Sequence, residues 1–71
     1  MSHLRQQFAQ RLKRLRFQKG ITQEELAKST GLSISFIRAI EQAINAPSFE
    51  SLEAISKALG IEVQDLFNFK D

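Results

Sequence analysis

The chain has 71 residues and a formal net charge of +2, which allows one small domain with a modest core. It has no cysteine, which excludes disulfides, zinc fingers and other thiolate metal sites. Its one histidine, His3, falls in an N-terminal segment expected to be frayed and solvated. No apolar run reaches membrane-spanning length, and no signal-peptide pattern is visible in the sequence. We therefore expect a whole protein of the cytoplasm, with no membrane contact, cofactor or bound metal.

Positive charge is concentrated at one end of the sequence. Residues 1–20 carry six basic side chains and no acid, whereas the remainder carries four basic and eight acidic side chains. A basic segment on an acidic body suits a polyanionic partner that approaches from one side. It suits a solvated helix face with no partner equally well.

The first apolar pattern predicts a helix over residues 3–18, which ends at Gly20. Its core residues fall on one stripe at helical spacing: Leu4, Phe8, Leu12 and Leu15. Arg16 lies at the edge of that stripe, where a charge is partly buried. Phe17 is far from the stripe, and we expect it to cover the turn to the next helix rather than form an exposed contact.

Residues 22–42 contain two short helical patterns separated by a tight turn at Gly31. Thr22 followed by Glu25 is the spacing of a capping box, which predicts a helix start at Thr22. Ser33 is a second cap, and apolar residues at helical spacing follow it. Two helices joined by such a turn are typical of the helix-turn-helix, which can place its second helix in the DNA major groove.

The predicted second helix of this unit, residues 34–42, has a polar residue on its inward side. Glu41 shares that side with Ile37 and Ile40, and an unpaired buried carboxylate is costly. Arg16 is the best candidate for its cationic partner. We predict a structural Arg16–Glu41 ion pair; the alternative is a solvent-exposed Glu41.

The remaining chain continues in helical patterns. Residues 43–47 are expected to form a loop, and Ser48 caps a helix that ends at Gly60. A short fifth helix is expected over 63–67. The fold class is therefore all-α, a compact bundle of five short helices, with residues 1–71 as one domain.

Taken together, these motifs make the chain similar to the Cro/repressor-type (XRE-like) helix-turn-helix family of DNA-binding domains. The resemblance covers a core of about residues 8–68. It rests on these residues: Leu15-Arg16, Gly20 to Ala27 (Gly-Ile-Thr-Gln-Glu-Glu-Leu-Ala), Gly31-Leu32-Ser33, Ile37, Ile40-Glu41, Pro47-Ser48, Leu52 and Ala58 to Ile61. It implies a lambda-repressor-like fold in which the second and third helices read double-stranded DNA.

The resemblance also implies the DNA-binding residues. Those at the start of the unit and in the loop after it match phosphate contacts, and those on the third helix match recognition positions. The full set is Thr22, Gln23, Ser33, Ile34, Ser35, Phe36, Arg38, Ala39, Gln42 and Asn45. Arg38 can give a bidentate contact to guanine or hold a phosphate, and both roles stay open.

Two departures from the family pattern stand out. Ala43 occupies a place where the family usually has glycine, which costs about 1 kcal/mol if a left-handed conformation is kept. The loop can instead turn at Asn45. The same loop usually carries Lys or Arg, whereas Ile44 and Asn45 are uncharged, which should reduce the salt dependence of binding.

The leading hypothesis is a transcriptional regulator, a repressor or controller that binds an inverted-repeat operator as a homodimer. Three apolar residues near the C-terminus exceed what the core can absorb and form the expected dimer interface: Val63, Phe67 and Phe69. The alternative for these residues is that they simply cover the base of the bundle. The alternative is an antitoxin or antirepressor whose recognition helix binds a protein partner. No enzyme is expected, because the chain has no paired carboxylates in a pocket, no glycine-rich phosphate loop and no catalytic cysteine or histidine.

Overall fold

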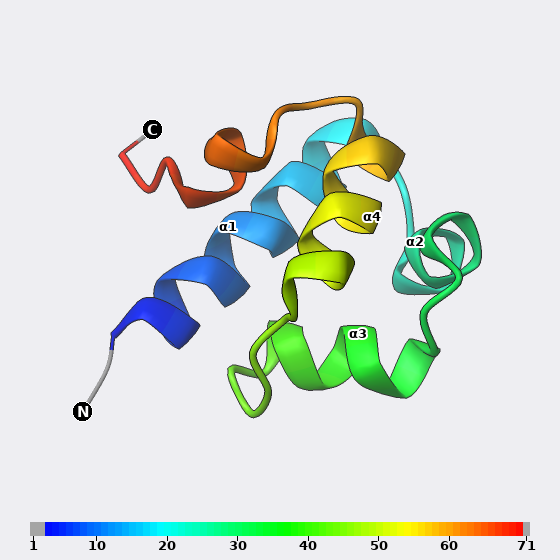
Figure 1. Ribbon diagram of the computed structural model, residues 1–71, viewed down its shortest axis with the longest axis horizontal. Coiled ribbons are helices and arrows are strands. Elements are labelled where there is room, and N and C mark those ends of the chain that lie inside the picture. Colours follow the sequence, from blue (N-terminus) through cyan, green and yellow to red (C-terminus); the bar gives the residue numbers. More distant parts are fainter. Residues whose placement is uncertain (1–2, 71) are drawn as a thin grey trace.

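The computed structural model describes residues 3–70 and contains four α-helices followed by a 3-10 helix (Figure 1). The elements are α1 (Leu4–Lys19), α2 (Gln23–Thr30), α3 (Ile34–Glu41), α4 (Phe49–Leu59) and the 3-10 helix η1 (Val63–Phe67). The all-α class is confirmed, but the fifth predicted helix is of the 3-10 type. Met1, Ser2 and Asp71, which the predicted domain includes, lie outside the described residues. None of the described helices has the length and apolar character needed to cross a bilayer.

One hydrophobic core joins all five elements. Its fully buried side chains come from every helix: Leu12, Leu26, Ile37, Ile40, Ile55 and Leu66. α1 packs on α3 and η1, while α2 packs on α3 and α4. The small side chain of Ala27, itself buried in this core, allows close packing of α2 against its neighbours. Burial of one large aliphatic side chain contributes about 1.5–3 kcal/mol, so this shared core holds the short helices together.

The helix ends follow the predicted signals. Gly20, Gly31 and Gly60 all have positive φ after α1, α2 and α4, a conformation that glycine adopts without a Cβ clash. At the turn between α2 and α3, the Thr30 hydroxyl donates to the Leu26 carbonyl and accepts from the Leu32 amide. These bonds fix the direction in which α3 leaves α2.

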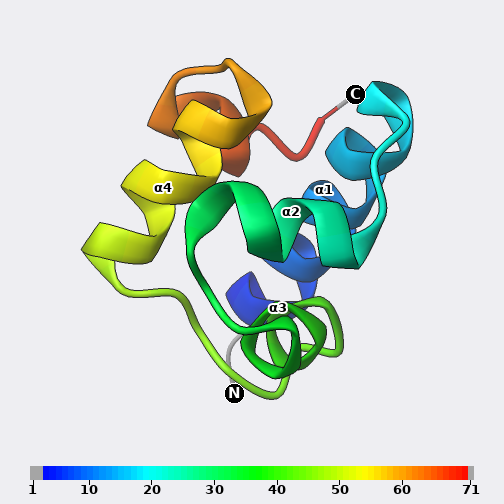
Figure 2. The ribbon, with the colours of Figure 1, turned by 90° about the vertical axis from the view of Figure 1, so that its right-hand side faces the viewer.

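α3 lies along one edge of the molecule, with its long side uncovered (Figure 1). The turned view shows α2 directly beside it and the end of α4, with η1, at the opposite edge (Figure 2). In both views the first turn of α1 lies close to the loop that follows α3. The fold therefore presents α2, α3, this loop and the start of α1 on one side.

Three apolar residues differ from their predicted places. Leu4 was expected in the core stripe but is 50% exposed, in the first turn of α1. Phe17 does not cover the turn after α1; it is 67% exposed, with the Arg16 guanidinium 4.9 Å from its ring centroid. The helical spacing of Leu52, Ile55 and Leu59 predicts Phe49 at the margin of their core stripe, yet Phe49 is 84% exposed.

Candidate nucleic-acid interface

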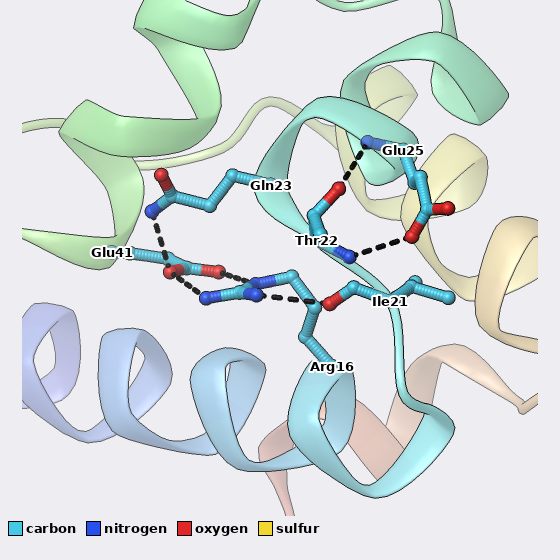
Figure 3. Close-up of polar contacts among 6 residues, drawn as sticks. All are labelled: Arg16, Ile21, Thr22, Gln23, Glu25 and Glu41. Carbon is cyan, nitrogen blue, oxygen red and sulfur yellow. Dashed lines mark hydrogen bonds and ion pairs between the residues drawn. The ribbon is translucent and has the colours of Figure 1, made fainter.

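The start of α2 is fixed by the predicted capping box (Figure 3). The Thr22 hydroxyl accepts from the Glu25 amide at 3.0 Å, and the Glu25 carboxylate accepts from the Thr22 amide at 2.9 Å. The Thr22 hydroxyl keeps its own proton for an outside acceptor. The first turn of α2 therefore offers an O–H donor and the positive end of a helix dipole to an anion.

The ion pair predicted between Arg16 and Glu41 is present and buried (Figure 3). Arg16 Nε donates to Glu41 Oε2 at 2.8 Å, and Arg16 Nη2 donates to Oε1 at 2.9 Å, which makes the pair bidentate. Arg16 Nη1 also donates to the Ile21 carbonyl at 3.0 Å. One guanidinium therefore ties α1, the entry to α2 and the end of α3 together.

Gln23 joins the same network, which the sequence did not predict. It was expected outside the core, yet it is only partly exposed, and its Nε2 donates to Glu41 Oε1 at 2.9 Å. An amide nitrogen has two protons, so one remains for a phosphate oxygen. The predicted DNA-backbone residue of α2 is thereby positioned by the carboxylate that ends α3.

Arg16 stays charged under all ordinary conditions. The hydrogen bond with Glu41 raises the pKa of Arg16, which outweighs the opposite effect of burial, and the nearby negative charge raises it further. A group whose pKa is raised on folding adds stability that is complete below its unfolded pKa and is lost only as the pH rises through the folded one. Since an arginine titrates far above the physiological range, the contribution of Arg16 is constant across that range.

The predicted recognition residues of α3 divide into two groups. Ser35 and Arg38 are exposed, as is Gln42, the predicted phosphate contact that follows the helix. Ile34, Phe36 and Ala39 are only half-buried, and the first two pack on the core with part of their surface. Ser33 accepts from the Phe36 amide at 3.1 Å, which leaves its hydroxyl proton outward.

The loop after α3 turns at Ala43. This residue has φ +62°, the left-handed conformation in which the family usually has glycine. α3 ends at Glu41, one residue before its predicted end, and Gln42 forms its cap. Asn45 is exposed in this loop, next to Ile44, which is 60% exposed.

The basic side chains of α1 do not form one surface. Arg16 is buried in the ion pair, and Arg11, which is 8% exposed, donates from Nε to the Asp65 carbonyl at 3.0 Å. Lys13 and Arg14 are exposed, in keeping with their place away from the apolar stripe of α1. At the first turn, Arg5 donates to the Ile44 carbonyl. The sequence did not reveal the roles of Arg11 and Arg5, because both side chains bond to backbone carbonyls of residues far away in the chain. Every residue has a carbonyl, so the amino-acid type of the acceptor residue does not indicate such a bond.

The predicted dimer residues lie together beyond α4. Val63 and Phe67 are 36% and 37% exposed, and Phe69 is partly buried. The Phe67 ring lies 5.2 Å from that of Phe8 and 6.1 Å from that of Phe69, centroid to centroid. An aromatic cluster thus extends from the core to the surface at this end.

With this geometry established, comparison with known proteins identifies the family. A family model described as helix-turn-helix matches residues 12–66, which include the second half of α1 and all of α2, α3 and α4. The chain belongs to the Cro/C1-type helix-turn-helix family. This is a family of DNA-binding transcriptional regulators and not of enzymes, and its members bind double-stranded DNA.

Three relatives show the extent of the similarity. The chain is 38% identical to the HTH-type transcriptional regulator SinR of Bacillus licheniformis over 63 residues, 87% of this chain and 57% of SinR. It is 35% identical to the control protein C.BamHI of Bacillus amyloliquefaciens over 69 residues, 96% of this chain and 85% of the relative. The crystal structure of the restriction-modification controller protein C.AhdI of Aeromonas hydrophila superposes with a TM-score of 0.84 at 38% identity, over 86% of this chain and 92% of that one. The chain therefore spans a little over half of SinR but most of each controller protein.

Proposed function

We propose that this chain is a sequence-specific transcriptional regulator, a repressor or controller, that binds an inverted-repeat operator as a homodimer in the cytoplasm. In this proposal residues 1–71 form one DNA-binding domain, with its core over 8–68 and its helix-turn-helix over 22–42. The observation that carries it is the position of α3. A buried bidentate ion pair fixes the inner side of α3 while its outer side, with Arg38, stays exposed.

Each part of this surface has a role in the proposal. Around the start of α2, Thr22 and Gln23 donate to phosphates, as does Ser33 before α3, where the first-turn amides have no intrahelical acceptor. Gln42 and Asn45 contact phosphate beyond the other end of α3. The base-reading residues lie between these anchors: Ile34, Ser35, Phe36, Arg38 and Ala39. The apolar members among them suit thymine methyl groups.

Dimerisation would supply the specificity that one such helix lacks. Two copies related by a two-fold axis double the base contacts and place the half-sites about one DNA turn apart. The exposed parts of Val63 and Phe67, and the Phe69 ring 6.1 Å from that of Phe67, support an interface at this end. In sedimentation, Val63→Glu should convert the dimer into a folded monomer, since Val63 is not among the buried core residues. A variant that stays dimeric would place the interface elsewhere.

Selection of bound duplexes from a random DNA pool tests the proposal as a whole. We expect an inverted repeat to be enriched at moderate salt. Absence of any enriched motif would refute sequence-specific regulation.

A second candidate function is supported by the apolar character of the recognition surface. Ile34, Phe36 and Ala39, with the exposed Ile44 nearby, suit contact with a protein, as in an antitoxin or antirepressor. This function predicts weak, salt-sensitive DNA binding without sequence preference. It also predicts that Arg38→Ala leaves the biological activity intact, which the leading proposal does not.

A further inference from the structure

The loop after α3 offers an approaching phosphate few donors of its own. Its backbone amides turn back onto α3: Ala43 donates to the Ile40 carbonyl at 3.0 Å, and Ile44 and Asn45 both donate to the Ala39 carbonyl, at 2.9 and 3.2 Å. Its other side chains carry no donor: Ala43, Ile44, Ala46 and Pro47. The amides of Gln42 and Asn45 are uncharged.

The electrostatic setting of this loop is also unfavourable to an anion. The C-terminal end of a helix carries partial negative charge from its last carbonyls, and this loop lies at that end of α3. The proposed phosphate contact at Gln42 and Asn45 therefore needs a positive charge from another part of the chain.

Arg5 supplies a positive charge at this place. Its Nη1 donates to the Ile44 carbonyl at 3.1 Å, across 39 residues of sequence, and the side chain is exposed. Both ribbon views place the first turn of α1 near this loop (Figures 1 and 2). A guanidinium has five N–H donors in a planar fork, and the bond to Ile44 uses one of them.

We propose that Arg5 binds a DNA phosphate, and that its bond to the Ile44 carbonyl holds the guanidinium beside the end of α3 for this contact. The inference rests on the proposed DNA-binding function and adds to it a residue outside the helix-turn-helix. It also assigns the cation that the loop itself lacks to a residue 39 positions earlier in the chain.

Salt dependence of DNA binding tests this assignment, because a phosphate contact releases a counterion. The dissociation constants of the full chain and of Arg5→Ala would be measured by fluorescence anisotropy over a range of salt concentrations. A selected duplex and an unrelated duplex would both be used. We expect the slope of log affinity against log salt to fall by about one unit for each protomer bound. The affinity for both duplexes should fall by the same factor.

Two further variants, together with thermal unfolding, test whether the effect of Arg5→Ala comes from a lost phosphate contact. The other possible causes are the change in net charge and a weakened loop after α3. Lys13→Ala removes the same charge from the same helix about 12 Å further along its axis, and should leave the slope unchanged. Arg5→Lys keeps the charge and should retain most of the wild-type slope. Thermal unfolding followed by circular dichroism should give all variants nearly the wild-type Tm, because both side chains are exposed.

The outcomes are distinct. If Arg5→Ala keeps the wild-type slope, or if Lys13→Ala lowers it equally, Arg5 does not bind a phosphate, while the proposed regulator can still stand. A wild-type protein that prefers no sequence but still binds duplexes would refute specific regulation, and the slopes would still decide the role of Arg5. A wild-type protein that binds neither duplex would overturn both proposals.

Discussion

The inner and outer sides of α3 differ in where their partners lie. On the inner side, Ile37 is fully buried in the core, and Glu41 holds Arg16 of α1 in a bidentate pair. On the outer side, Ser35 and Arg38 are exposed. Because the contacts on the inner side are made within this chain, substitutions there should lower the free energy of unfolding. The proposed partner of the outer side is another molecule, so outer substitutions should act on binding alone.

The largest effect is expected from breaking the inner side. Glu41→Ala leaves Arg16 buried without its carboxylate and removes the acceptor of Gln23, so we expect a loss of about 3–5 kcal/mol of unfolding free energy. A single core of this size seldom supplies more than about 3–5 kcal/mol in total. The variant should therefore be largely unfolded at 25 °C, as measured by far-ultraviolet circular dichroism and urea titration.

Glu53→Ala is the matched control for this loss. It removes an exposed carboxylate from α4, and we expect it to change stability by no more than about 0.5 kcal/mol. If Glu41→Ala cost no more than this control, the ion pair would not be what fixes α3 against α1.

The next effect should appear on the outer side, in binding and not in folding. Arg38→Ala should weaken binding to the selected operator by about five- to 150-fold, the equivalent of about 1–3 kcal/mol for a lost bidentate contact. Its unfolding free energy should stay within about 0.5 kcal/mol of wild type, because the side chain is exposed. Anisotropy titrations with selected and unrelated duplexes, alongside urea unfolding, would measure both.

The pattern of the Arg38→Ala loss decides the role that the sequence leaves open. A base contact would relax preference at one operator position, whereas a phosphate contact would weaken both duplexes alike. Lys57→Ala, an exposed cation near the end of α4 and away from α3, should leave binding unchanged. Equal losses from both variants would assign the effect to net charge and remove Arg38 from the reading surface.

The contacts on the inner side of α3 could be predicted because both residues of a contact can be recognised in the sequence. Arg16 at the edge of one stripe and Glu41 on the inward side of another helix have complementary charge, and the structure pairs them. The caps were equally readable, since Thr22 and Glu25 bond each other within four residues. Such signals were enough to obtain the all-α class and the course of the chain.

Where one partner is backbone or solvent, the sequence was less informative. The burial of Arg11 carries no signal in the sequence, because the Asp65 carbonyl that accepts from it is a group that any residue could provide. Phe17 was expected to cover a turn, since an exposed aromatic ring gains none of the free energy of burial. Its ring instead lies beside the Arg16 guanidinium, a contact worth about 0.5–1 kcal/mol at an exposed site. The DNA contacts stay predictions for the same reason, because their partner is outside the chain.

The smallest effect is expected from replacing Ala43, in the loop that follows α3. This substitution should raise stability, whereas the substitutions above lower stability or binding. Its φ of +62° places a Cβ where an L-residue loses about 1–2 kcal/mol relative to the right-handed conformation. Ala43→Gly relieves this cost but adds about 0.4–1 kcal/mol of unfolded-state entropy. The net expectation is a gain of about 0.5–1 kcal/mol, seen as a rise of a few degrees in Tm. Operator affinity should not change, because the loop keeps its conformation.

A neighbouring alanine provides the matched control for this gain. Among residues 3–70, Ala43 is the one non-glycine residue with positive φ, so Ala46→Gly relieves no strain. It should lower stability by about 0.4–1 kcal/mol through the same unfolded-state entropy. The two substitutions thus make the same chemical change three residues apart with opposite expected signs. If both lowered stability equally, the left-handed turn at Ala43 would carry no strain, and the departure from glycine there would be neutral for folding.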